Sequence, residues 1–212
     1  MTDFITYENE TIPETIDWDL LNKYGGVCKN YDKDEYIFRE GQNAHFYHQV
    51  VEGKIKMVSE TSDGKEFIQG FFVTGQSFGE PPVFEGGEYP ASAIAEQSSI
   101  IIRLSIPSFI QLLRENFTVH FKITKLLAKR IKNKANTLKE ISCYSPEHRI
   151  ISLLENFKKE KVGVVAGNKV KIDYTRKQIA DMTGLRVETV IRVMRTLHDK
   201  KILTIEKGKV FY

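Results

Sequence analysis

The sequence predicts an α+β protein with an all-β first half, a helical centre and a basic, mainly helical C-terminal third. Turns that contain glycine recur about every ten residues between positions 31 and 105, which is typical of a sandwich or barrel of short strands. Residues 108–141 contain neither glycine nor proline, and their apolar residues have helical spacing. Further along, Thr175 with Gln178 predicts a helix start, and Gly184 predicts a tight turn between two helices.

Length and charge narrow the classes of protein that fit. The 212 residues suffice for two domains, and the 41% hydrophobic content suffices for packed cores. No apolar run reaches the roughly eighteen residues of a membrane span and no signal peptide opens the chain, so we expect a cytoplasmic protein. Residues 1–105 carry 8 Lys/Arg against 18 Asp/Glu, residues 106–143 carry 8 against 2, and residues 144–212 carry 15 against 8. A cationic C-terminal third suits a domain that neutralises phosphates, although an ordinary solvated basic surface gives the same counts.

Residues 1–106 are expected to form the all-β domain, with a helical turn at 18–21 before the first strand. The turn signals are Glu40-Gly41, Glu52-Gly53, Asp63-Gly64, Thr74-Gly75 and Glu85-Gly86-Gly87. Asp63-Gly64 is the best tight turn among them, so the segment from Val50 to Gly75 is expected to form successive hairpins.

Residues 107–141 are expected to form one long amphipathic helix. A helix over 108–141 would be about 50 Å long, which is more than a small domain needs for itself. A heptad repeat places Phe117, Thr124, Ile131 and Leu138 at one position and His120, Leu127, Lys134 and Ile141 at the other. Five of these eight residues are apolar, which predicts a dimer seam of the coiled-coil type. The alternative is a helix that packs only on its own β domain.

We place a hinge at 142–145 and the C-terminal domain at 146–212. Ser145 as N-cap and Pro146 at the first helical position predict a helix over about 147–158, followed by a loop or hairpin between 162 and 174. A capping box at Thr175, small Ala180, Gly184 and apolar Val190 and Val193 then have the offsets of a helix-turn-helix. Residues 202–211, centred on 207–209 (Lys-Gly-Lys), are expected to form a two-stranded wing.

The second helix of this motif is expected to read DNA bases in the major groove. Arg192 suits the O6 and N7 atoms of guanine and Glu188 suits the amino group of cytosine, so together they can read one G·C pair. Because the two residues are four apart they share a face and are expected to brace each other; a simple intrahelical ion pair is the alternative. The expected base contacts are Val187, Glu188, Ile191 and Arg192. The expected phosphate contacts are Thr175, Arg176, Lys177, Arg186, Thr189, Arg195 and Lys207.

Residues 175–203 resemble the DNA-binding domain of the cyclic-AMP receptor protein/FNR superfamily of bacterial transcription regulators. The resemblance extends to 37–41 (Ile-Phe-Arg-Glu-Gly), to 75–80 (Gly-Gln-Ser-Phe-Gly-Glu) and to the long helix. It implies an N-terminal β-roll sensor domain (a double-stranded β-helix or jelly roll), a dimerisation helix and a winged helix-turn-helix. It also implies a homodimer on an inverted-repeat operator and RNA polymerase as a partner. Residues 187–192 are closer to the FNR branch, although Ile191 stands where FNR-type readers carry Ser.

The resemblance also defines an effector pocket, and this chain departs from it. Cyclic-nucleotide members close the pocket with an Arg-Ser pair where this chain has Pro90-Ala91, and Lys134 and Ala135 replace the Thr-Ser pair that reaches the base. Glu80 is retained and can bind a ribose, but a buried phosphate would lack its Arg. We therefore expect an effector other than cyclic AMP, such as an anion met by Lys134, or no effector. The expected pocket residues are Phe78, Gly79, Glu80, Pro90, Ala91, Lys134 and Ala135.

No cofactor is predicted. An iron–sulfur cluster of the FNR type needs four cysteines, and the chain has only Cys28 and Cys143. A haem on His45, His48 or His120 stays open, whereas a zinc site at His45 and His48 lacks a third ligand at metal spacing. Cys143 is either a redox switch beside the hinge or an ordinary cysteine.

Two other functions fit only part of the sequence. A cyclic-nucleotide-binding module that regulates a protein partner fits the β domain but leaves the helix-turn-helix and the charge asymmetry unexplained. An enzyme of the double-stranded β-helix type would need a His-x-His metal motif, a catalytic serine motif or a glycine-rich phosphate loop, and the sequence has none of these. We therefore expect a DNA-binding protein and not an enzyme.

Overall fold

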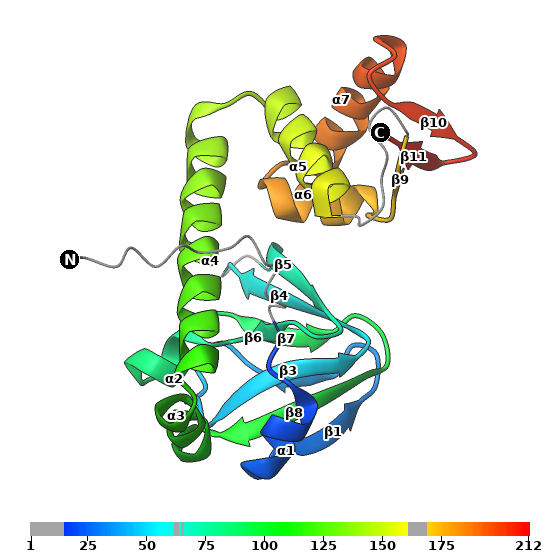
Figure 1. Ribbon diagram of the computed structural model, residues 1–212. Coiled ribbons are helices and arrows are strands. Elements are labelled where there is room, and N and C mark those ends of the chain that lie inside the picture. The colour runs from blue at the N-terminus through cyan, green and yellow to red at the C-terminus, as the bar shows by residue number, and fades with distance from the viewer. Residues whose placement is uncertain (1–14, 62–63, 65, 161–168) are drawn as a thin grey trace, which may run out of the picture. The chain divides into compact units, whose positions relative to one another are not determined.

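The structure is a computed structural model that describes residues 15–61, 64, 66–160 and 169–212 (Figure 1). The chain divides into two compact units, residues 1–58 with 71–130 and residues 59–70 with 131–212. The turn expected at Asp63-Gly64 and the segment expected at 162–174 lie partly outside the described residues. No helix in the described ranges is long and apolar enough to cross a membrane.

Most strands precede residue 106 in the chain, and most helices follow it. The first part contains α1 (Trp18–Lys23), β1 (Val27–Tyr31), β2 (Tyr36–Phe38), β3 (Phe46–Glu52), β4 (Lys54–Glu60), β5 (Glu66–Val73), β6 (Ser77–Phe78), α2 (Pro81–Glu85), β7 (Ser92–Ala95) and β8 (Ser99–Ser105). The second part contains α3 (Ile106–Glu115), α4 (Phe117–Cys143), α5 (Pro146–Glu160), β9 (Lys171–Ile172), α6 (Arg176–Thr183), α7 (Val187–Asp199), β10 (Thr204–Glu206) and β11 (Lys209–Phe211).

The predicted β domain is confirmed as two four-stranded sheets. One sheet has the strand order β1-β8-β3-β6 and the other has the order β2-β7-β4-β5. The pairs β1–β8, β3–β8 and β4–β7 are antiparallel, with register partners such as Tyr47 and Leu104. Strands end beside the glycines of the predicted turns: Gly53 lies between β3 and β4, and Gly75 lies between β5 and β6. The strands wind into a roll (Figure 1).

The helices of the first unit complete its core. Tyr47 of β3 stacks on Phe109 of α3 with ring centroids 4.2 Å apart, and both side chains are buried. Ile123 and Leu126 of α4 are buried in the same cluster, and Trp18 of α1 packs against it. The first three turns of α4 therefore belong to the hydrophobic core of the β-roll unit.

The prediction of one long helix over 107–141 is wrong, because the chain forms two helices that are separated at Asn116. Asn116 has φ −129° and ψ 82°, outside the helical region. Its side-chain amide donates to the Leu112 carbonyl at 2.9 Å and to the Tyr24 hydroxyl at 3.1 Å. These bonds hold the non-helical conformation, and the remaining helix, α4, has 27 residues and a length of about 40 Å.

The second unit contains the predicted winged helix-turn-helix. The Ser145 hydroxyl accepts a hydrogen bond from the His148 amide, as expected of an N-cap at the start of α5. Helix α4 continues to Cys143, so only Tyr144 and Ser145 of the predicted hinge 142–145 lie outside the helices. Strands β9, β10 and β11 form one antiparallel sheet, in which β10 and β11 are the expected wing. Side chains of α5, α6, α7 and the wing form one core around Leu154 and Met194.

Candidate nucleic-acid interface and ligand region

The turn between α6 and α7 has the geometry that the sequence predicted. The Thr175 hydroxyl accepts from the Gln178 amide at 3.1 Å, while the Gln178 side chain accepts from the Thr175 amide at 2.9 Å. This reciprocal capping box fixes the first turn of α6. Gly184 ends α6 with φ 67° and ψ 21°, a left-handed conformation that residues with a side chain adopt at a cost. The chain therefore reverses sharply before α7 begins at Val187.

Helix α7 has one face in the core and the other in solvent. Val190, Met194 and Leu197 are buried, and they recur at the spacing of one helical face. Glu188 and Arg192 lie on the opposite side and are exposed, as the base-reading prediction requires. No ion pair joins these two side chains in the part of the chain that the structure describes, so the expected bracing is absent. Both charged groups therefore remain available to a ligand.

The other expected base and phosphate contacts differ in their surroundings. Ile191 is 37% exposed, whereas Val187 packs against the core. Arg186 and Arg195 are exposed, and Thr189 is half-buried. Lys207 is exposed at the tip of the wing, in the turn that joins β10 to β11. Arg186, Arg195 and Lys207 are thus the exposed cations among these residues.

The start of α6 is more constrained than the sequence suggested. The Thr175 hydroxyl is used by the capping box. Arg176 is half-buried, and burial lowers the pKa of its guanidinium from the ordinary value. The ammonium of Lys177 lies 3.3 Å from a carboxylate oxygen of Glu66 on β5 and 3.9 Å from a carboxylate oxygen of Asp181. Sequence analysis did not find Glu66, since 111 positions separate it from Lys177.

The expected dimer seam on α4 is largely exposed. Phe117, Ile131 and Leu138 have 77%, 70% and 67% of their surface exposed, although each is a large apolar residue. His120 and Thr124 are also exposed. The remaining seam residues have partners within the chain: Leu127 packs on the β-roll core, Lys134 bonds to Gln69 and Ile141 lines a cavity. An apolar stripe at heptad spacing therefore faces solvent in the single chain.

Within the first unit, the predicted pocket loop is tied to α4 by Arg130. Its guanidinium donates to the Glu80 carboxylate at 2.6 Å and to the Ser77 carbonyl at 2.7 Å. Of the expected pocket residues in this unit, Phe78, Gly79, Glu80 and Ala91 are buried and Pro90 is exposed. Sequence analysis missed Arg130, which is 50 positions from Glu80 and has no local motif to mark it.

Aromatic rings fill the interior of the roll beside this loop. The rings of Phe38 and Tyr89 stack with centroids 3.6 Å apart, and a Cβ at Gly79 would come within 2.8 Å of the Phe38 ring. Phe38 and Phe78 also surround His48, each with its ring centroid 5.4 Å from the imidazole. Burial and the nearby Arg103 charge lower the pKa of His48 to about 3, so the imidazole is neutral at physiological pH. The interior is therefore apolar and aromatic.

Three polar atoms in this region are buried without a hydrogen-bond partner. They are Nδ1 of His48, Oγ of Ser77 and Oε1 of Glu80. All three side chains are less than 5% exposed and belong to the first unit. Buried polar atoms are normally satisfied, so unpaired ones mark a place where a bound molecule can donate or accept. The aromatic interior of the roll therefore also contains polar groups that other side chains of the described residues do not fully satisfy.

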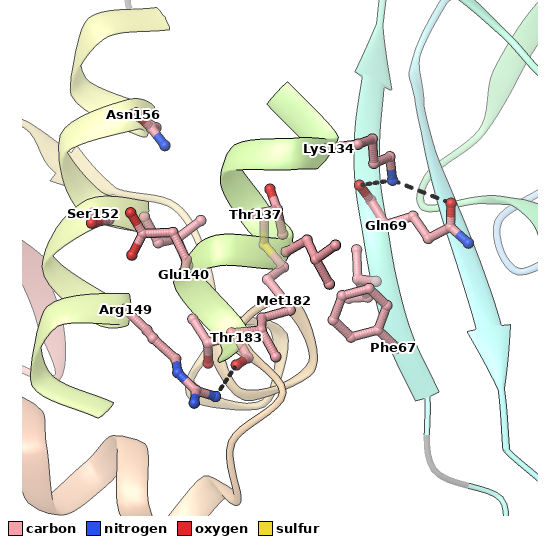
Figure 2. Close-up of a pocket in the computed structure, with 14 residues that line it drawn as sticks. Phe67, Gln69, Lys134, Thr137, Glu140, Arg149, Ser152, Asn156, Met182 and Thr183 are labelled. Carbon is pink, nitrogen blue, oxygen red and sulfur yellow. Dashed lines mark hydrogen bonds between the residues drawn. The ribbon is translucent and has the colours of Figure 1, made fainter. Parts of the chain in front are cut away.

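Lys134 and Ala135, the other two expected pocket residues, belong to the second unit. Lys134 donates to the backbone oxygen and the side-chain oxygen of Gln69, both at 3.3 Å, and Ala135 is exposed. Figure 2 shows Lys134 at one end of a cavity of about 290 Å³. Residues of β5 (67–69), α4 (134–141), α5 (149–156) and the end of α6 line this cavity. On α5, Arg149 donates to the carbonyls of Tyr144 and Thr183 and so connects the hinge to the helix-turn-helix.

The histidines and cysteines do not gather into a cluster. His45 and His120 are exposed, whereas His48 is buried. Cys28 and Cys143 are both exposed. Across the described residues, no three His, Cys, Asp or Glu side chains lie where they could hold one metal ion.

Comparisons with known proteins agree with this architecture. A family model for the cyclic nucleotide-binding domain matches residues 28–116, and a model for the Crp-like helix-turn-helix domain matches residues 148–211. The cAMP-activated global transcriptional regulator CRP of Pasteurella multocida is 25% identical over 195 residues, which cover 92% of each chain. The c-di-GMP responsive global regulator CLP of Xanthomonas campestris has a TM-score of 0.77 at 19% identity, covering 92% of this chain and 98% of that one. A CooA mutant from Carboxydothermus hydrogenoformans has a TM-score of 0.78 at 16% identity, covering 91% and 84%.

Proposed function

Because the chain belongs to the Crp/Fnr family of helix-turn-helix transcription regulators, we propose that it binds an inverted-repeat operator as a homodimer in the cytoplasm. The observation that carries this proposal is the division of α7, which buries Val190, Met194 and Leu197 and exposes Glu188 and Arg192. A helix held in this way presents its N-terminal half to the major groove. RNA polymerase is the expected protein partner.

The two charged residues of α7 would specify sequence, with Ile191 and Val187 beside them. Arg192 would donate to guanine and Glu188 would accept from the paired cytosine. Lys177, Arg186, Arg195 and Lys207 would contact phosphates, with Thr175, Arg176 and Thr189 close to the backbone. Phosphate contacts set the register of the protein on the duplex but carry no sequence information.

The dimer would form along α4. The exposed Phe117, Ile131 and Leu138 share one heptad position with Thr124, and they form a stripe that a second copy of the same helix can cover. Two copies related by a twofold axis would place their α7 helices in successive major grooves, about one turn of DNA apart. This symmetry is the reason to expect an inverted repeat.

The effector is proposed to be a small molecule other than cyclic AMP that binds beside Glu80. Three observations support this choice. Pro90 stands at the position that carries the phosphate-binding Arg in cyclic-nucleotide members. The guanidinium of Arg130 lies near Glu80, but it already bonds to Glu80 and to the Ser77 carbonyl. The orphan atoms of His48, Ser77 and Glu80 supply polar contacts of their own. Calorimetric titration with cyclic AMP should show no binding, and a cyclic-AMP-dependent gain in DNA affinity would overturn the assignment.

The DNA-binding proposal is tested by selecting duplexes from a random pool and measuring variants on the selected site. Arg192→Ala should cost about 1–3 kcal/mol at one base pair of each half-site and relax the preference there. Lys177→Ala should weaken binding to operator and non-operator duplexes alike. Lys33→Ala, which removes an exposed charge from the first unit, is the matched control and should change neither. Equal losses of Arg192→Ala on every sequence would contradict its role in base reading.

A further inference from the structure

Glu66 lies beside Lys177, the proposed phosphate contact at the start of α6. It is the first residue of β5, and its carboxylate lies 3.3 Å from the ammonium of Lys177 at the start of α6. Both residues belong to the second unit, and the Lys177 side chain is 68% exposed. Asp181 lies one helical turn further along α6 and contacts the same ammonium at 3.9 Å. Lys177 therefore lies between two carboxylates.

The segment that carries Glu66 is also fixed to α4. Gln69 accepts two hydrogen bonds from Lys134, one at its backbone oxygen and one at its side-chain oxygen (Figure 2). Phe67 and Ile68, between the two bonded residues, line the cavity of the second unit. Residues 66–69 thus contact α4 and α6 within this unit, and β5 continues to Val73 as a strand of the β2-β7-β4-β5 sheet.

We propose that Glu66 competes with DNA phosphate for Lys177 and so holds the chain in a form with lowered DNA affinity. The inference rests on the proposed role of Lys177 as a phosphate contact. A phosphate oxygen and the Glu66 carboxylate are both anions that seek the same ammonium, and bringing them together costs electrostatic energy. A DNA phosphate at the start of α6 therefore requires Glu66 to withdraw. Separation of the Glu66 carboxylate from Lys177 favours the DNA-binding form.

The expected size of this effect follows from the exposure of the pair. Ion pairs between exposed side chains contribute about 0–1 kcal/mol, which corresponds to at most about a fivefold change in an equilibrium constant. The competition should weaken as salt rises, since screening reduces the attraction between exposed charges. Glu66 would therefore act as a modest, salt-sensitive brake on DNA binding.

The test uses the full-length chain and a double-mutant cycle. Glu66→Gln should tighten binding to a selected operator duplex and to a non-operator duplex by about two- to fivefold at low salt, as measured by fluorescence anisotropy. Glu60→Gln removes an exposed carboxylate from the end of β4 and controls for the loss of one negative charge. Lys177→Gln should weaken binding, and in that background Glu66→Gln should have no effect.

The outcomes separate this inference from the proposed function. If Lys177→Gln weakens binding but Glu66→Gln changes nothing, the competition is overturned while the phosphate contact stands. If Glu66→Gln and Glu60→Gln tighten binding equally, or if the gain persists without Lys177, the effect is one of general charge and the competition is also overturned. If Lys177→Gln leaves DNA affinity unchanged, the phosphate contact fails and the competition fails with it. Circular dichroism of each variant confirms that its fold is retained.

Discussion

The ion pair between Arg130 and Glu80 allows a sharp test of how α4 is bound to the β-roll. The guanidinium carbon of Arg130 lies 5.2 Å from the centroid of the Phe72 ring. Replacing Arg130 by Met keeps a long side chain that can still contact this ring. The change removes the two hydrogen bonds to Glu80 and to the Ser77 carbonyl. It leaves the Glu80 carboxylate, which is 2% exposed, without a cation.

The magnitude follows from that burial. Removing one partner of a fully buried ion pair costs about 3–5 kcal/mol, because the other charge stays buried and uncompensated. The Arg130 side chain is 26% exposed, so water can partly replace it. We therefore expect Arg130→Met to lower the free energy of unfolding by about 2–3 kcal/mol.

Urea unfolding, followed by tryptophan fluorescence, measures this loss. Trp18 is the only tryptophan of the chain and packs against the core of the first unit, so it reports on the unit that contains the pair. Arg114→Met, at an exposed position on α3, is the matched control and should change stability by less than about 0.5 kcal/mol.

A second variant identifies the cause of the loss. Glu80→Gln in the Arg130→Met background removes the uncompensated charge and should recover at least about 1 kcal/mol. A loss in Arg130→Met no larger than that of Arg114→Met would refute the argument from burial. A double variant as unstable as Arg130→Met alone would show that lost packing, and not the buried charge, caused the change.

Three further predictions concern the turn, the buried histidine and the seam. Gly184→Ala should lower the free energy of unfolding by about 1 kcal/mol, because φ is +67° while the added methyl meets nothing within 4 Å; an unchanged melting temperature would contradict this. The pKa of His48 in the folded chain is about 3, so below pH 6.5 the unfolded chain takes up a proton that the folded chain refuses and stability falls. Between pH 7 and pH 5 the free energy of unfolding of the wild type should fall by about 2 kcal/mol more than that of His48→Phe. Urea unfolding at each pH measures this difference, and an equal dependence on pH in the two proteins would contradict it. Ile131→Glu should dissociate the dimer in sedimentation experiments, whereas Lys132→Glu on the neighbouring exposed position should not; a dimer that survives Ile131→Glu would show that the seam lies elsewhere.

Local patterns explain which parts of the site could be predicted from sequence. The capping box at Thr175 and the left-handed residue at Gly184 depend on residues within about ten positions, and both are found as expected. The split of α7 into a buried and an exposed face follows from its apolar spacing, so the exposure of Glu188 and Arg192 could also be predicted. Such features need no knowledge of the rest of the fold.

Contacts between distant residues explain what the sequence did not reveal. The helix break at Asn116 is held partly by Tyr24, which is 92 positions away, so the lack of glycine and proline between 108 and 141 was a misleading guide. The pairs Arg130–Glu80 and Lys177–Glu66 span 50 and 111 positions and have no sequence signature. The bracing expected between Glu188 and Arg192 failed for another reason. Exposed pairs four residues apart gain so little that neither side chain is held.

The same distinction explains why the ligand is harder to identify from the sequence than the DNA-binding surface. The three unpaired polar atoms belong to His48 of β3, Ser77 of β6 and Glu80. His48 is distant in the sequence from the other two, and the three residues come together only in the folded β-roll. A buried polar atom that is left unsatisfied costs about 1–3 kcal/mol, and His48, Ser77 and Glu80 each carry one atom without a partner among the described residues. A molecule that satisfies them would stabilise the β-roll by a similar amount, offset by the entropy of binding. A polar small molecule that raises the melting temperature of the wild type, but raises it less when Ser77 is replaced by Ala, is therefore the result to seek.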